Sequence, residues 1–108
     1  MPNSYFFIGI GGSGMSAIAQ VLARRGHRVA GSDRSLDQGK DIPVFRQLRS
    51  AGVVLHPQDG SGVREDCDFV VVSTAIEKTV PDMARALELG VAVKHRSDLL
   101  ADIFNTGS

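Results

Sequence analysis

Short apolar runs typical of β-strands alternate with helical patterns along the whole 108-residue chain. Such alternation predicts parallel β-α-β units. The predicted strands are 5–10, 28–31, 53–55, 69–72 and 91–93. Because crossovers between parallel strands are right-handed, we predict an α/β fold with a Rossmann-like, doubly wound parallel sheet. It should form a single domain with five strands in the order 3-2-1-4-5.

The composition is that of an ordinary globular domain, with 43% hydrophobic and 22% charged residues. Twelve acidic and twelve basic side chains cancel, so no overall field favours nucleic acid or an anionic membrane. No apolar run approaches the ~20 residues of a membrane span. The first 23 residues contain no Lys or Arg, unlike a signal peptide. These features predict a cytoplasmic protein with no nucleic-acid or membrane partner.

The residue types that most often carry metal or nucleophilic chemistry do not form a recognisable pattern. Cys67 is the single cysteine, so it has no disulfide partner in the chain and no CxxC partner for zinc. A half-buried, unreactive thiol is the favoured interpretation. Neither metal-ligand spacing nor a Ser-His-Asp arrangement is present. We therefore predict no metal site and no catalytic residue within these residues.

A glycine-rich turn joins the first predicted strand to the first predicted helix. Residues 8–16 read IGIGGSGMS and contain the spacing Gly9-x-Gly11-x-x-Gly14. Residues without a Cβ let the backbone turn sharply and approach an anion, which the N–H groups of the following helix bind. Ser13 and Ser16 add hydroxyl groups within the first turn. In its strand–turn–helix context the motif predicts a nucleotide diphosphate site.

Asp33 ends the second predicted strand, nineteen residues after Gly14. An acid at this place hydrogen-bonds the ribose in many dinucleotide-binding domains. The alternative interpretation is a helix N-cap or turn residue, because Ser-Asp is a common turn pair. The glycine motif does not distinguish NAD from another nucleotide diphosphate.

Three further local predictions concern the connections. The polar stretch RSLDQGKDIP, residues 34–43, is predicted to be a loop. Thr79 and Asp82 have the spacing of a capping box at the start of the fourth helical pattern, with Pro81 in its first turn. Residues 105–108 are predicted to be a linker or tail.

The longer pattern around these motifs resembles the N-terminal domain of the Mur ligases. The matching segments are F-I-G-I-G-G-S-G-M-S-A-I-A at 7–19, V-A-G-S-D at 29–33, D-F-V-V-V-S-T-A-I at 68–76, V-P-D at 80–82, E-L-G-V at 88–91 and H-R-S-D-L-L-A at 95–101. They occur in order over almost the whole chain. The GIGGxGMS segment is considerably more specific than the glycine spacing alone.

The resemblance implies a domain that holds the UDP part of UDP-N-acetylmuramate or a related UDP-sugar. The parent would be an ATP-dependent amide ligase of peptidoglycan precursor synthesis that adds L-alanine. The diphosphate would lie on Gly11, Gly12, Ser13, Gly14, Met15 and Ser16. Ser32 and Asp33 would face the uridine, and Ser73, Thr74 and Ala75 would line the other side of the crevice. Arg96 matches a family arginine that borders the substrate.

Some features depart from the family pattern. The 34–43 stretch is longer than usual, and the Gly-His pair that typically follows the third strand is absent; we assign His56 no role. These differences suit a ligase-like paralogue as well as a ligase. The GxxGK[ST] loop by which the family's central domain binds ATP does not occur in these residues.

We therefore expect residues 1–104 to be a binding domain without catalytic activity or a cofactor of its own. ATP and Mg would belong to a central domain joined to it through 105–108. Two other classes remain open, an NAD(P)-binding module of an oxidoreductase or redox regulator and an interaction domain that binds no nucleotide.

Overall fold

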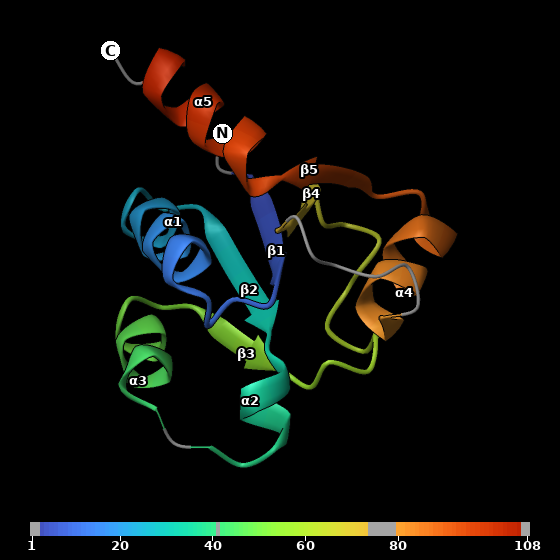
Figure 1. Ribbon diagram of the computed structural model, residues 1–108. Helices are drawn as coiled ribbons and strands as arrows, with labels where there is room; N and C mark the ends of the chain where they lie inside the picture. The colour runs from blue at the N-terminus through green and yellow to red at the C-terminus, as the bar shows by residue number, and fades with distance from the viewer. Residues whose placement is uncertain (1–2, 41, 74–79, 107–108) are drawn as a thin grey trace.

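The computed structural model describes residues 3–40, 42–73 and 80–106 (Figure 1). Its strands are β1 (Ser4–Ile8), β2 (Arg28–Ser32), β3 (Val54–His56), β4 (Phe69–Val72) and β5 (Ala92–His95). Its helices are α1 (Ser13–Arg24), α2 (Arg34–Asp37), α3 (Pro43–Ser50), α4 (Pro81–Leu89) and α5 (Arg96–Thr106). None of the helices in these described ranges combines the length and apolar character that a bilayer span requires.

The five strands form one parallel sheet in the order β3-β2-β1-β4-β5, which confirms the predicted fold class and strand order. β1 lies at the centre and pairs with β2 and β4. Its neighbour β2 runs in register with it from Ser4 opposite Arg28 to Ile8 opposite Ser32. Because every strand runs the same way, the segments that follow the strands all emerge at one edge of the sheet.

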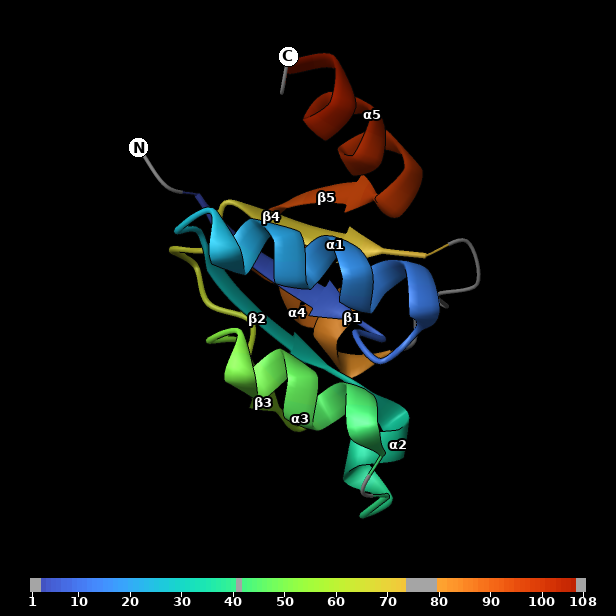
Figure 2. The same ribbon diagram turned by 90° about the vertical axis from the view of Figure 1, so that its left-hand side faces the viewer.

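Helices cover both faces of the sheet, as a doubly wound fold requires (Figure 2). On one face, Tyr5 and Phe7 of β1 pack in a core with buried residues of α1, α3 and α5. On the other face, Phe6 and Ile8 pack with Ala86 of α4 and with residues of the connection between β3 and β4. The alternation along β1 explains this division, since successive side chains of a strand point to opposite faces.

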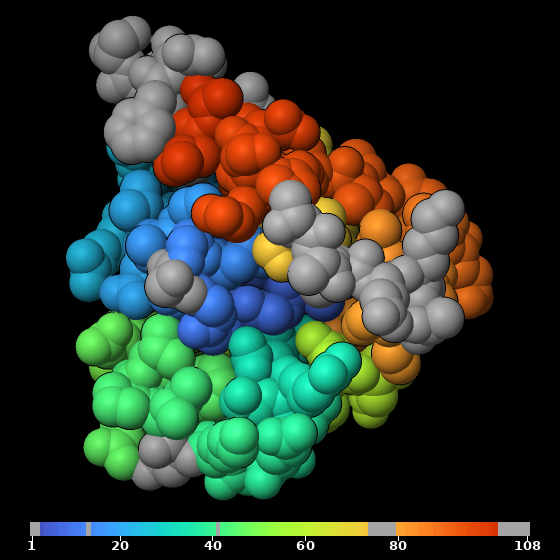
Figure 3. Space-filling view, viewed as in Figure 1, coloured from blue at the N-terminus to red at the C-terminus, as the bar shows by residue number. Residues whose placement is uncertain are grey.

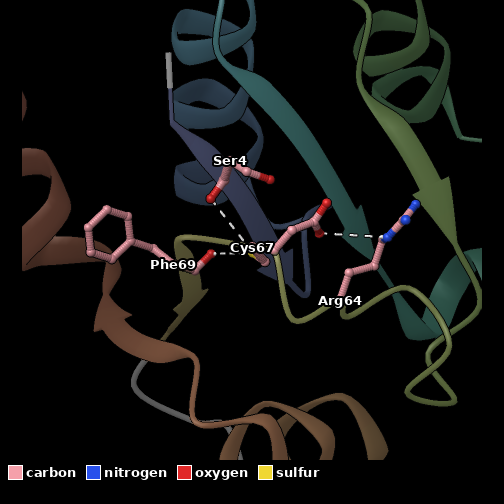
Figure 4. A network of polar contacts seen from close by, with 5 residues as sticks. Ser4, Arg64, Cys67 and Phe69 are labelled. Carbon is pink, nitrogen blue, oxygen red and sulfur yellow. Dashed lines mark hydrogen bonds and ion pairs between the residues drawn. The ribbon is translucent and has the colours of Figure 1, made fainter. Parts of the chain in front are cut away.

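The connection between β3 and β4, residues 57–68, crosses the second face without a helix (Figure 1). Its end is fixed to β1, because the Ser4 N–H donates to Asp68 over 2.7 Å. The Cys67 thiol contacts the carbonyl oxygens of Ser4 and Phe69 at 3.6 and 3.1 Å (Figure 4). Burial raises the pKa of this thiol, which favours the neutral form. The predicted half-buried cysteine is confirmed.

Three connections differ from their sequence-based predictions. The stretch predicted as a loop after Asp33 begins with the short helix α2, with Asp33 as its N-cap. α4 has Val80 as its N-cap, one residue after the Thr79 of the predicted capping box, and Thr79 lies outside the described residues; the Asp82 carboxylate accepts from Ser32 and Gly60. α5 extends through Thr106, so two residues of the predicted tail are helical. Each difference involves a short or terminal element, for which sequence periodicity is least informative.

Candidate functional site

Most of the predicted site residues in the described ranges follow β1, β2, β4 or β5, so they gather at the carboxyl edge of the sheet. The glycine loop (residues 9–12) and the first turn of α1 follow β1, and Asp33 follows β2. Ser73 follows β4, and Arg96 begins α5 directly after β5. In the space-filling view, the orange-red start of α5 lies against the blue surface formed by the beginning of the chain (Figure 3). Segments more than eighty residues apart in sequence thus meet at one place.

Hydrogen bonds to the end of β2 fix the backbone of the glycine loop. The Ser32 carbonyl accepts from the N–H groups of Gly9 and Ile10, at 2.8 and 2.9 Å. The Gly12 N–H donates back to the Gly9 carbonyl at 3.1 Å. Gly9 has φ = +80°, a conformation that residues with a Cβ rarely adopt. The loop therefore needs glycine at its first position for the turn itself.

Asp33 supplies the acceptor for the next amide of the loop. Its Oδ2 accepts from the Gly11 N–H at 2.8 Å, and its Oδ1 accepts from the Ser35 N–H at 2.8 Å. The same carboxylate therefore caps α2 and holds the glycine loop. A Cβ on Gly11 would lie only 2.7 Å from Asp33 Oδ2 and 3.1 Å from Phe45. Glycine at position 11 allows this close approach.

The first turn of α1 presents the remaining backbone donors. Its first intrahelical bond runs from the Ser16 N–H to the Gly12 carbonyl, at 2.8 Å. Helix geometry leaves the N–H groups of residues 13–15 without an acceptor inside α1. The N-cap, Gly12, has no side chain to cap them, and the first turn contains no acidic residue. The positive end of the helix dipole is at this turn, which favours an anion.

Arg96 brings a second positive group to the same turn. A Cβ added to Gly14 would lie 2.6 Å from Nη1 of Arg96 and 3.3 Å from its Cζ. The guanidinium group therefore packs directly against the Gly14 backbone. Two independent sources of positive potential, the helix terminus and the arginine, converge on one point. An anion bound there would receive hydrogen bonds from both.

Sequence comparisons identify the family of the chain. The family described as "Mur ligase family, catalytic domain" matches residues 4–107. The chain belongs to this family. It is 47% identical over 100 residues to the UDP-N-acetylmuramate–L-alanine ligase of Streptomyces griseus, covering 92% of this chain and 20% of that relative. The enzyme of the same name from Rubrobacter xylanophilus is 44% identical over 100 residues, covering 93% and 21%. The chain thus spans about a fifth of the length of these relatives.

Solved structures of Mur ligases share the fold. The UDP-N-acetylmuramate–alanine ligase from Thermotoga maritima superimposes with a TM-score of 0.81 at 27% identity, over 94% of this chain and 23% of that one. A murein peptide ligase from Psychrobacter arcticus gives a TM-score of 0.81 at 25% identity, over 93% and 20%. The resemblance stated from the motifs is therefore confirmed at the level of the family.

Other predicted site residues of this Mur ligase domain are placed less directly. The Met15 side chain is buried in the core beneath α1, so only its backbone amide is directed to the turn. Ser16 is buried as well. Ser73 is partly exposed after β4. Thr74, Ala75 and the side chain of Ser13 lie outside the part of the chain that the structure describes.

The Ser32 side chain lies on the face of the sheet that α4 covers. Its side chain is fully buried, and its hydroxyl donates to Oδ2 of Asp82 in α4. The other oxygen of Asp82 accepts from the Gly60 N–H at 2.8 Å. Burial raises the pKa of the Asp82 carboxyl, although both hydrogen bonds favour its charged form. Sequence reasoning missed this cluster because it assigned Asp82 to a local cap.

Proposed function

We propose that this chain binds the UDP part of UDP-N-acetylmuramate as the substrate domain of a Mur ligase. The diphosphate would accept hydrogen bonds from the amides of residues 13–15 and from the Arg96 guanidinium. The observation that carries the proposal is the packing of Arg96 against Gly14. A helix N-terminus alone would bind many anions, whereas the added arginine suits the two negative groups of a diphosphate.

The remaining contacts of this proposal are carried over from the family resemblance. Asp33 lies beside the loop and would limit the uridine side, while Ser73, Thr74 and Ala75 would line the opposite side. The Ser32 side chain is buried, so its part in this scheme is to hold the loop through its carbonyl. Gly11 and Gly12 would supply close backbone approach.

We further propose that the whole protein is the ligase that joins L-alanine to this substrate. The printed names of the relatives favour L-alanine as the amino acid. ATP and Mg would bind in other domains, in cis, that activate the substrate carboxylate. The present residues would then contribute substrate binding in the cytoplasm, where peptidoglycan precursors carry UDP.

Ligand-dependent thermal unfolding tests the binding proposal. We expect UDP-N-acetylmuramate to raise the Tm of the 108-residue chain, and UDP to raise it less. A ligand at one hundred times its Kd adds about 2.7 kcal/mol to the free energy of unfolding, enough to shift the Tm of a small domain by several degrees. Arg96→Gln should remove most of this shift. Arg25→Gln is the matched control, because Arg25 is exposed at the opposite end of α1.

An NAD(P)-binding module is the second candidate, and the position of Asp33 after β2 favours it. Both carboxylate oxygens of Asp33 already accept backbone hydrogen bonds, so a ribose would have to compete with them. NADH and NADPH are therefore included in the same experiment. Stabilisation by either dinucleotide without stabilisation by UDP would reverse the ranking.

A further inference from the structure

Asp82 lies behind the sheet, outside the crevice, yet it is connected to the glycine loop. Among the described residues, Asp82 is the charged side chain that is fully buried. Taking a carboxylate out of water costs several kcal/mol unless hydrogen bonds replace the lost solvation. Asp82 is the second residue of α4. Its complete burial needs an explanation other than helix formation.

The contacts of Asp82 lead to the end of β2. Its carboxylate accepts from the Ser32 hydroxyl and from the Gly60 N–H. The Gln58 side-chain amide also donates to the Ser32 hydroxyl oxygen, at 3.4 Å. The side chain of Ser32 is therefore held from α4 and from the segment that follows β3.

The backbone of the same residue holds the glycine loop. The Ser32 carbonyl accepts from Gly9 and Ile10, and the next residue, Asp33, accepts from Gly11. Three consecutive amides of the loop thus depend on the position of the Ser32-Asp33 pair. That position sets the direction in which α1 presents the amides of residues 13–15.

We propose that Asp82 is a positioning residue for the anion site, which it controls by holding Ser32 from the opposite face of the sheet. The inference rests on the proposed binding of a UDP-sugar, and it adds a residue that touches no part of the ligand. The raised pKa of the carboxyl agrees with its burial but is not needed for the geometry.

The test uses Asp82→Ala and Ser32→Ala in the 108-residue chain. Two readouts are measured, the backbone amide resonances of residues 9–14 and the Kd for UDP-N-acetylmuramate at a temperature where each variant is folded. We expect both variants to shift the loop resonances and to weaken binding by about tenfold, the effect of one hydrogen bond to a charged group. The double variant should be less than additive, because both changes break one connection.

Asp59→Ala is the matched control. Asp59 lies in the same connection and accepts from Ser61, but no hydrogen bond links it to Ser32. It should leave the loop resonances and the Kd unchanged. If Asp82→Ala does not fold, Ser32→Ala decides the question, because it keeps the backbone carbonyl and removes only the hydroxyl.

Two results would overturn different claims. A lowered Tm with unchanged loop resonances and Kd in both variants would make Asp82 a merely structural residue. Failure of the unmodified chain to bind either UDP-N-acetylmuramate or UDP would refute the proposed function instead. In that case the loop resonances still decide whether Asp82 positions the loop.

Discussion

Gly14 is the residue at which the start of α1 and the Arg96 guanidinium meet. A Cβ there would lie 2.6 Å from Nη1, the far end of a flexible side chain. Gly14→Val should therefore displace the guanidinium and cover the first-turn amides, while α1 accepts valine at least as well as glycine. We expect the free energy of unfolding to change by less than about 1 kcal/mol. Binding of UDP-N-acetylmuramate, measured by calorimetric titration, should weaken by about tenfold or more.

The double variant Gly14→Val with Arg96→Gln tests whether Gly14→Val acts through the Arg96 guanidinium. Because both changes remove the same guanidinium from the site, their effects on the Kd should be less than additive. Unaltered affinity in Gly14→Val would mean that the diphosphate does not lie over Gly14.

At the scale of elements, α1 begins without a side-chain cap. The first-turn amides therefore stay available to an anion, and the helix lacks the stabilisation that a capping side chain would give. Gly12 has φ = −63° and ψ = 145°, a conformation suited to a capping residue. The nearest atoms to an added Cβ are the Gly9 oxygen at 3.4 Å and Met15 Cγ at 3.9 Å, so a side chain fits. Gly12→Asp should cap α1 and raise the free energy of unfolding by about 0.5–1 kcal/mol. Its carboxylate should weaken UDP-sugar binding by about tenfold or more.

Gly12→Asn separates capping from charge, because asparagine caps a helix comparably without adding a negative group. Its stability gain should persist, with a smaller loss of affinity than in Gly12→Asp. Urea unfolding and titration with UDP-N-acetylmuramate check both variants. Tight binding by the Asp variant would place the diphosphate elsewhere.

Elements with strong local patterns could be predicted from the sequence, and short elements could not. The apolar run of β4 and the helical spacing from Met15 to Leu22 each identified an element. The helix α2 has four residues, too few to show a periodicity. The residue that indicates this helix is Asp33, its N-cap, because N-cap was one of the two interpretations of Asp33. The capping-box spacing did not indicate that Asp82 bonds Ser32 and Gly60, because a fixed spacing does not reveal whether a side chain faces its own helix or the sheet.

At the scale of the whole molecule, the strand order could be predicted because crossover handedness constrains it. Contacts between distant residues could not. Ser32 and Asp82 are fifty positions apart, and no local pattern indicates that they meet. Arg96 was found only through the family resemblance, since a lone arginine at a helix start has no distinctive spacing. The site therefore depends on contacts between distant residues, which result from the folded topology and have no local pattern in the sequence.

The pH dependence of the free energy of unfolding tests the buried cluster of Ser32, Asp82 and Gly60. Burial raises the pKa of Asp82 above its ordinary value of 3.8, so the folded state binds this proton more tightly than the unfolded chain. The resulting stabilisation is complete below pH 3.8 and is lost as the pH rises through the folded pKa, with a slope of at most about 1.4 kcal/mol per pH unit. The nearby Asp37 and Asp59 raise the pKa in the same direction. The pKa of Asp59 itself is lowered by its hydrogen bonds to Ser61, which gives the opposite trend.

Subtracting the Asp82→Asn variant from the unmodified chain removes the contribution of Asp59, which both proteins share. Denaturant unfolding of the two proteins from about pH 4 to pH 7 should show the unmodified chain losing stability relative to the variant as the pH rises. The difference should level off once Asp82 is ionised in both states. A difference that stays flat would mean that folding does not raise the pKa of Asp82. A difference that grows in favour of the unmodified chain would mean that the hydrogen bonds from Ser32 and Gly60 outweigh burial and lower this pKa.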